Sequence, residues 1–317
     1  MAGGSTVWDW QKVTAVAAWQ PRDSMARAVF KNRIWILGGW FDSYQPCPRD
    51  VWSSADGAHW DLVRAEAPWK HSDLSMSLAF ADKLWLMGGW FNGRLPDGEA
   101  GNEVWSSPDG NDWERMTPAA GWSPRLGAGA VVFKNRMWIL GGLENYFSGT
   151  EKDLRNDVWS SADGRDWKQE CAQAPWSPRA FHQAVVFNDK IWVLGGGNYV
   201  PEYRASSDVW SSEDGVHWTE VTAAAPWCAR LWFSSLVYRN CLWVLGGWTK
   251  EPFQDLNDVW YSRDGRNWNQ LPSGTIWTPR HEHAAYVLHG KMWVAGGLAR
   301  PLSNEVWSLE LPEDSFP

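Results

Sequence analysis

The hydrophobic positions of this chain fall in short runs that are separated by turn residues and by pairs of glycines. In one representative stretch, residues 127–133 and 137–140 form two apolar runs, residues 156–161 form a third, and residues 167–170 begin a fourth. The Asp163-Gly164 pair between the last two is a hairpin signal. Runs of this length, bounded by glycine and turn residues, predict β-strands. The stretch is therefore expected to form four antiparallel strands.

The same pattern recurs along the whole chain. A glycine pair follows the second apolar run of each copy, at Gly38-Gly39, Gly88-Gly89, Gly141-Gly142, Gly195-Gly196, Gly246-Gly247 and Gly296-Gly297. The pairs are 50, 53, 54, 51 and 50 residues apart. A period of this length with four short strands per copy is typical of a β-propeller, in which each copy forms one blade. The sequence therefore predicts an all-β, six-bladed propeller that occupies residues 1–317 as one domain.

The sixth copy is divided between the two ends of the chain. It stops at residues 305–311, which match a third strand, whereas residues 10–13 match the fourth strand of the other copies. The N-terminal strand is therefore expected to complete the C-terminal blade. This pairing would close the ring and leave no free edge between blades.

Several motifs of the repeat point to a known family. Each copy has an apolar strand that ends in Gly-Gly, a segment such as Asn156-Asp157-Val158-Trp159, a second Trp at a fixed spacing, and in most copies a Pro-Arg pair such as Pro178-Arg179. In these features, over roughly residues 7–311, the chain resembles the kelch-repeat propellers of the galactose oxidase/kelch-like superfamily. The resemblance implies a choice among functions, because kelch propellers include protein-binding modules, sialic acid mutarotases, galactose oxidases and plant specifier proteins.

Composition limits the classes of partner and the cellular compartment that we expect for this protein. The net charge is −8 with no basic cluster, so no nucleic-acid partner is expected. The apolar runs have the length of strands, which predicts no membrane span, and the N-terminus lacks the apolar core of a signal peptide. The four cysteines form no close pair and are expected to be free thiols. Together these features predict a cytoplasmic protein.

One face of the predicted propeller carries long loops. The segments between Gly-Gly and Val-Trp hold 11, 14, 15, 12, 11 and 8 residues, whereas the turns on the other face are short. Binding sites are commonly placed on long loops over a rigid frame. Aromatic residues that the repeat does not explain gather on this face or next to it, and the candidates are Trp40, Trp90, Trp232, Trp248, Phe181, Phe233, Tyr146 and Tyr199. We interpret them as the walls of one composite pocket, although each ring could instead bury the backbone of its own loop.

Arginines recur at one position of the segments that connect the blades. Five of the six copies carry Arg three residues after a connecting Trp, at the point where the first strand enters the central channel. Arg125, Arg179, Arg230 and Arg280 are therefore candidates for holding an anionic or polar group, because the guanidinium fork matches a carboxylate. In the alternative interpretation, each Arg pairs with the acid that precedes Val-Trp in its own copy.

The residues next to these arginines differ between copies and bring titratable groups to the channel mouth. His281, Glu282, His283 and His182 are the acid–base candidates, and His71 and Asp73 are further candidates for ligand binding. Imidazole and carboxyl groups in a partly desolvated pocket suit proton transfer near neutral pH. Because kelch copies often carry His at the positions of His182 and His283, these two could instead be structural donors.

We also considered a metal site. His182, His281 and His283 could supply three imidazoles, and galactose oxidase, which belongs to the same class of propeller, binds copper. The tyrosine–histidine ligand pattern of that enzyme has no residue-by-residue match here. We therefore predict no metal and no cofactor.

Three functions fit these observations. The first is a small-molecule site at the channel mouth with cofactor-independent acid–base chemistry, of the isomerase, mutarotase, cyclase or lyase type. The second is a protein-interaction module that binds an acidic peptide or partner. The third is a lectin-like propeller that binds carbohydrate. Because the extra aromatic and titratable residues are distributed unequally among the copies, we favour one composite small-molecule pocket.

Overall fold

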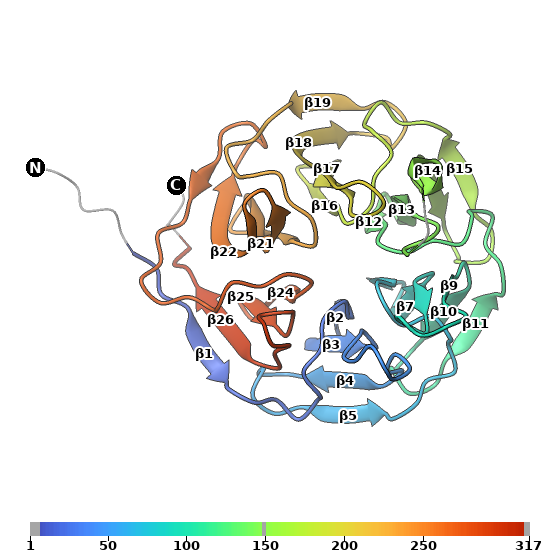
Figure 1. Cartoon of the computed structure of the whole chain (residues 1–317), viewed down its shortest axis with the longest axis horizontal. Helices are drawn as coiled ribbons and strands as arrows, with labels where there is room; N and C mark the ends of the chain where they lie inside the picture. Colours follow the sequence, from blue (N-terminus) through green and yellow to red (C-terminus); the bar gives the residue numbers. More distant parts are fainter. Residues whose placement is uncertain (1–6, 148–149, 314–317) are drawn as a thin grey trace, which may run out of the picture.

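A computed structural model describes residues 7–147 and 150–313 of the chain. Within these residues the strands form six four-stranded antiparallel sheets, arranged around a central axis as the blades of a propeller (Figure 1). The first strand of each blade lies nearest the axis and the fourth lies at the rim. The prediction of an all-β, six-bladed propeller is confirmed.

The elements follow the repeat closely. Blade 1 comprises β2 (Ala26–Phe30), β3 (Arg33–Leu37), β4 (Val51–Ser54) and β5 (Asp61–Arg64). Blade 2 comprises β6 (Met76–Phe80), β7 (Lys83–Met87), β10 (Val104–Ser107) and β11 (Glu114–Thr117). Blade 3 comprises β12 (Gly129–Phe133), β13 (Arg136–Leu143), β14 (Leu154–Ser161) and β15 (Lys168–Cys171). Blade 4 comprises β16 (Gln183–Phe187), β17 (Lys190–Asn198), β18 (Arg204–Ser212) and β19 (Thr219–Thr222). Blade 5 comprises β20 (Ser234–Tyr238), β21 (Cys241–Lys250), β22 (Phe253–Ser262) and β23 (Asn269–Gln270). In the loops, β8 (Trp90–Phe91) pairs with β9 (Glu99–Ala100), and η1 (Glu151–Asp153) is a short 3-10 helix.

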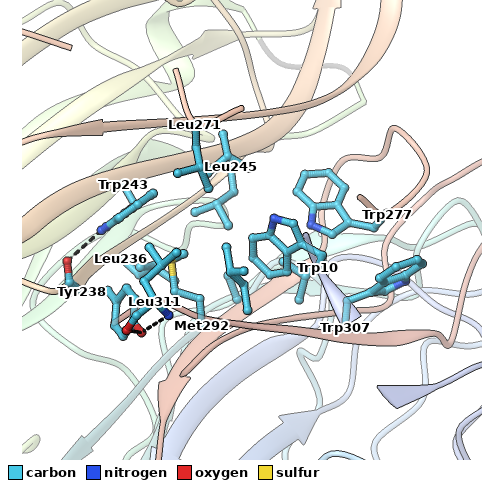
Figure 2. Packing of buried hydrophobic residues seen from close by; sticks show 14 of the residues in the cluster. Trp10, Leu236, Tyr238, Trp243, Leu245, Leu271, Trp277, Met292, Trp307 and Leu311 are labelled. Carbon is cyan, nitrogen blue, oxygen red and sulfur yellow. Dashed lines mark hydrogen bonds between the residues drawn. The ribbon is translucent and has the colours of Figure 1, made fainter. Parts of the chain in front are cut away.

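The sixth blade contains both ends of the described chain. Its inner strands are β24 (Ala284–Leu288), β25 (Lys291–Ala295) and β26 (Val306–Glu310), and β1 (Gln11–Thr14) pairs antiparallel with β26. Figure 2 shows the apolar cluster between this blade and blade 5, in which Trp10 lies beside Trp277 and Trp307. The strand pairing and the buried Trp10 together fix the N-terminal segment to the C-terminal blade.

Packing between tryptophans explains why two Trp positions, the connecting one and the one at the fourth strand, recur in every copy. The six connecting tryptophans are at most 1% exposed, and each meets the fourth-strand Trp of a blade edge-on, with ring centroids 5.7–6.1 Å apart. The pairs are Trp19–Trp60, Trp69–Trp113, Trp122–Trp167, Trp176–Trp218, Trp227–Trp268 and Trp277–Trp10. Such T-shaped contacts stabilise aromatic pairs beyond their burial. Trp10 therefore occupies the place of a fourth-strand Trp.

An Asp-Gly turn joins each of blades 1 to 5 to the preceding blade of the ring. In blade 3, the Ser161 hydroxyl accepts a hydrogen bond from the backbone N–H of Gly164, and the Asp163 carboxylate accepts two more from residues 165 and 166. Gly164 has a φ of +76°, and a Cβ there would lie 2.1 Å from the ring of Trp85 in blade 2. Only glycine fits this approach, which is why the turn recurs with its Gly.

A buried ion pair, which we call the arginine clamp, is present in five of the six blades that the structure describes. Each clamp arginine is at most 2% exposed; it donates to the carbonyl oxygen of the first Gly of the glycine pair and to the acid before Val-Trp. The pairs are Arg22–Asp50, Arg125–Asp157, Arg179–Asp208, Arg230–Asp258 and Arg280–Glu305, with N–O distances of 2.5–3.0 Å. Blade 2 has Ser72 instead, and there His71 Nδ1 lies 3.1 Å from Glu103 Oε1.

This geometry corrects two expectations about ligand-binding residues. The guanidinium groups of Arg125, Arg179, Arg230 and Arg280 are buried and saturated by an acid and a carbonyl oxygen. They hold the third strand to the entry of the first, as the alternative interpretation states. His71 replaces the missing arginine of blade 2 and is likewise structural.

The fold has two further properties that bear on the sequence predictions. None of the helices among the described residues is long and apolar enough to cross a membrane. The four cysteines, all within the described ranges, are free.

The arginine clamp predicts a large difference between two Arg→Met variants. Arg179→Met leaves the Asp208 carboxylate buried without its cation, so we expect the free energy of unfolding to fall by about 3–5 kcal/mol. Arg165→Met removes an exposed pair with Glu114 and should cost less than about 1 kcal/mol. Guanidinium denaturation of both variants measures the difference, and equally small losses would show that the clamp is dispensable.

Candidate functional site

The channel mouth is framed by one residue from each blade, located two positions after the clamp arginine or after Ser72. We call these residues the mouth ring: Ser24, Leu74, Gly127, Phe181, Trp232 and Glu282. All six have a φ between +52° and +59°. Among the described residues, backbone N–H groups of this ring donate to carbonyl oxygens of the preceding blade's ring residue in five places, over 2.8–3.1 Å. One backbone position thus presents five different side chains and one glycine to the channel.

A cavity of about 390 Å³ lies at the mouth ring on the long-loop face. One side carries the carboxyl groups of Asp23, Asp73 and Glu282, which we call the acid cluster. The other side is an aromatic wall made of Tyr146, Phe147, Tyr199, Trp232, Trp248 and Phe253. Trp40, Arg94, His281 and Arg300 complete the polar and cationic part of the lining.

The two aspartates of the acid cluster are buried, and the side chain of Glu282 is 10% exposed. Asp23 is 2% and Asp73 is 5% exposed, and the Ser24 hydroxyl lies 3.1 Å from Asp23 Oδ1. Burial raises the pKa of Asp73 to about 7, although hydrogen bonding with Ser24 and the charge of Arg94 oppose the rise. Burial and the charge of Asp73 raise the pKa of Asp23 well above its ordinary value. Carboxyl groups packed this closely hold protons that exposed acids would have lost at neutral pH.

Glu282 connects the acid cluster to a histidine. Its carboxyl group is hydrogen-bonded with that of Asp23, and burial, together with the charges of Asp23 and Asp73, raises its pKa well above the ordinary value. Glu282 Oε2 also lies 4.0 Å from Nε2 of His281. A proton-holding carboxyl and an imidazole nitrogen therefore face the same cavity.

His281 is held in place from two directions. Its Nδ1 lies 2.5 Å from Oδ1 of Asp255, which also accepts a hydrogen bond from Arg300 Nε over 2.5 Å. Burial opposes ionisation of Asp255, but its pKa is lowered by the hydrogen bonds and charges of His281 and Arg300. Because an ionised Asp255 can only accept, the neutral imidazole carries its proton on Nδ1 and presents Nε2 as an acceptor. The ring also stacks on Trp232, with centroids 5.3 Å apart.

The aromatic wall is a continuous set of ring contacts. Tyr199 meets Trp232 at 4.9 Å and Trp248 at 5.6 Å between centroids, and Tyr146 meets Phe147 at 4.6 Å. Trp232 and Trp248 are 7% and 3% exposed. The rings thus bury one another and still line the cavity, so both interpretations of the extra aromatic residues apply.

A second cavity of about 100 Å³ lies in the channel. Its lining includes all six mouth-ring residues, Phe181 among them, together with His182, His283 and Phe233. His182 and His283 are each 2% exposed and pack against Trp176 and Trp277, with centroids 6.0 and 5.4 Å apart. Phe233 holds the equivalent place in blade 5 against Trp227 at 6.0 Å. These two histidines therefore act as packing rings.

Their ionisation agrees with this role. Burial and the charge of Arg179 lower the pKa of His182 to about 3. Burial, followed by the charge of Arg280, lowers the pKa of His283 well below its ordinary value. Both rings stay neutral at physiological pH, which makes them poor acid–base groups. Packing and ionisation therefore both favour a structural role for these two histidines over the acid–base role expected from the sequence.

The structure places the remaining sequence candidates as follows. Trp40, Trp232, Trp248, Tyr146, Tyr199, Asp73, His281 and Glu282 line the mouth cavity. Trp90 is 4% exposed and lies beneath the loop that carries Arg94, with its Nε1 donating to Gly93 O over 2.8 Å. It supports the cavity from behind.

Sequence reasoning missed Asp23, Asp255, Arg94 and Arg300. Asp23 aligns with Asp73 and could have been selected with it. The other three lie in the segments between Gly-Gly and Val-Trp, which differ in length between copies and offer no aligned position; Asp255 belongs to β22. Within the described residues, no group of three or more His, Cys, Asp or Glu side chains has an arrangement that could hold a metal ion.

The comparisons with known proteins identify the family. The KLHDC2/KLHL20/DRC7 Kelch-repeats domain family matches residues 146–316, which is more than half of the chain. The chain therefore belongs to the kelch-repeat propellers.

Similar proteins of known name are much longer than this chain. It is 29% identical over 157 residues to Alpha-scruin of Limulus polyphemus, covering 44% of this chain and 15% of that protein. It is 31% identical over 123 residues to the Dynein alpha chain of the flagellar outer arm of Chlamydomonas reinhardtii, covering 37% and 3%. The chain thus spans less than a sixth of these relatives. The solved structure of YjhT matches with a TM-score of 0.73 at 15% identity, over 93% of this chain and 96% of that one, which shows the shared fold.

The packing role of His182 generates a pH-dependent prediction. Its pKa in the folded state lies below that of an unfolded histidine, so the unfolded state binds more protons between the two values. Stability is therefore lost as the pH falls from about 6.5 towards 3. His182→Phe, which places in blade 4 the residue type that blade 5 has at Phe233, should reduce the loss between about pH 7 and pH 4.5 by about 2–3 kcal/mol. Denaturation curves at both pH values test this, and an unchanged slope would show that His182 does not stay neutral.

Proposed function

We propose that the mouth cavity binds a small molecule and catalyses a cofactor-independent proton transfer on it, as an isomerase or lyase does. The observation that carries the proposal is the pairing of Glu282 with His281 across 4.0 Å, in a cavity with an aromatic wall. The cavity volume of about 390 Å³ falls in the range of small-molecule sites.

The two groups differ in a way that acid–base catalysis requires. Burial and neighbouring acids favour the protonated form of Glu282, while Asp255 orients His281 so that Nε2 accepts a proton. In the proposed reaction, His281 Nε2 removes a proton from the bound molecule and the Glu282 carboxyl returns one at a second atom. The proton count balances, and no oxidant or reductant is needed. Isomerisation, ring opening and closing, and elimination all have this form.

The ligand contacts differ from those expected from the arginines. The clamp arginines hold acids of the fold, so support for an anionic ligand is lost. The aromatic wall supplies the apolar contact area, and the acid cluster accepts hydrogen bonds from ligand hydroxyl or amino groups. The rings of the aromatic wall belong to blades 3 to 5 only. This unequal distribution favours a single pocket over a lectin, in which each blade would carry an equivalent site.

A protein partner is the second candidate. Tyr44 is 87%, Phe253 is 66% and Phe147 is 47% exposed, and all three belong to the long segments between Gly-Gly and Val-Trp on the mouth face. Exposed aromatic residues of this kind are enriched where proteins meet. A partner bound there would cover the mouth cavity.

Deuterium exchange tests the proposed chemistry. Compounds that raise the melting temperature in a metabolite screen are incubated with the protein in D2O, and mass spectrometry follows deuterium entering the compound. We expect exchange, with Glu282→Gln reducing its rate by about 100-fold or more while the compound still binds. Glu220→Gln, an exposed acid of β19, is the control and should behave as wild type.

Each contrary outcome has a distinct meaning. Binding without exchange would replace the enzyme with a binding protein. A folded protein that binds no compound but captures a partner through Phe147 and Phe253 would favour the second candidate. Retention of full exchange in Glu282→Gln would remove this residue from the mechanism.

A further inference from the structure

We infer that the ligand of the mouth cavity is an organic cation, in which an ammonium or guanidinium group is attached to an apolar body. The inference rests on the proposed small-molecule function of this cavity and specifies the class of ligand. It depends on the charges around the cavity, on an unpartnered carboxylate oxygen, and on cations that already contact aromatic rings at the rim.

Carboxyl groups predominate in the inner part of the cavity lining. Asp23, Asp73 and Glu282 lie together in the buried part of the lining. Of the lining cations, Arg300 is bound to Asp255, and Arg94 is exposed on the loop between β8 and β9. A ligand that fills the inner part of the cavity contacts these carboxyl groups, so a positive charge on it gains attraction to Asp73 in its ionised form and a negative charge meets repulsion.

Asp73 provides the second observation. It is 5% exposed, and its Oδ1 has no hydrogen-bond partner among the described residues. A buried carboxyl oxygen without a partner is costly, and a donor that also carries positive charge relieves that cost best. Asp73 lines the cavity, so a bound ammonium group can reach it. The isosteric amide of Asn would keep the shape and lose the charge.

Aromatic rings at the rim provide the third observation. The guanidinium of Arg94 lies over Trp40 at 5.2 Å from the ring centroid, and that of Arg300 lies over Phe253 at 5.1 Å. Both rings line the cavity, so its faces already attract cations. Deeper in, Trp232, Trp248 and Tyr199 are packed as neighbouring rings. Several aromatic rings beside carboxylates form the common recognition pattern for ammonium groups.

Binding of a cation should be linked to protons. Asp73 has a pKa raised to about 7 by burial, so it is only partly ionised at neutral pH, and a bound cation favours its ionised form. The groups that face the acid cluster are Ser24, Arg94, Tyr146, His281 and the buried Cys47. Binding therefore releases protons, and affinity rises as the pH increases from about 6 to about 8.

Matched probes test the sign of the ligand charge. Isothermal titration calorimetry uses 3-phenylpropylamine, 3-phenyl-1-propanol and 3-phenylpropionate, together with amine, alcohol and carboxylate triplets on bulkier ring bodies. We expect amines to bind about tenfold or more tightly than the alcohols, and carboxylates to bind weakest. Titration in buffers of different ionisation enthalpy should reveal proton release with the amines.

Two variants assign the effect to Asp73. Asp73→Asn should weaken amine binding by about tenfold, leave the alcohols unchanged and reduce proton release. Asp97→Asn changes an exposed acid on the same face and should match wild type. A thermal unfolding scan confirms that each variant is folded.

The outcomes separate the inference from the function beneath it. Tighter binding of alcohols or carboxylates than of amines overturns the inference and leaves the small-molecule function standing. Amine binding that Asp73→Asn does not weaken also overturns it. If no probe of any charge binds the folded protein, both the inference and the proposed function are wrong.

Discussion

A buried guanidinium–carboxylate pair fixes the geometry of most blades, and the site depends on it. In blade 4, Arg179 donates to Gly195 O and to both oxygens of Asp208, which ties the entry of the first strand to the ends of the second and third. Truncating one partner of such a pair leaves a buried charge, so the pair tolerates little change. Because the clamp fixes the backbone up to this point, the residue two positions later reaches the channel at the same place in every blade. The frame is repeated, and only the side chain it presents differs.

The mouth ring shows how a repeated fold acquires an asymmetric pocket. Non-glycine residues at positive φ are costly by about 1 kcal/mol or more, and five of the six ring positions carry one. Backbone hydrogen bonds from blade to blade hold these residues in that conformation. Phe181 and Trp232 thus lie together in blades 4 and 5, while Glu282, Ser24 and Leu74 lie in blades 6, 1 and 2. Equivalent backbone positions thus place aromatic rings on one side and the Glu282 carboxyl group on the other, and the remaining residues of the aromatic wall and of the acid cluster extend these two sides.

The sequence was sufficient to predict the fold because its signals are local. Glycine pairs, Asp-Gly turns and tryptophans recur at fixed spacing, and each has a packing reason such as the contact of Gly164 with Trp85. Glu282 and Trp232 could be selected because gap-free segments let six copies be compared. Asp255 and Arg300 could not, since they belong to the segments between Gly-Gly and Val-Trp, which differ in length between copies. The role of the arginines depends on whether they contact a ligand or the acid before Val-Trp, and a pattern of residue types does not distinguish these two partners. The residue type of His182 suggested chemistry, whereas its place matches that of Phe233, which favours a packing role.

The acid cluster allows two tasks that one carboxyl group could not perform together. A general acid must hold its proton until the reaction, whereas a counter-ion for a bound cation must have lost it. Asp23 and Glu282 are hydrogen-bonded to each other, and their mutual repulsion when ionised favours keeping one proton between them. Asp73, with a pKa near 7, loses its proton more readily. A cation bound beside Asp73 would stabilise the ionised form of Asp73, while the shared proton stays on the Asp23–Glu282 pair. The proposed ligand charge and the proposed proton transfer therefore support each other, because they use different members of the same cluster.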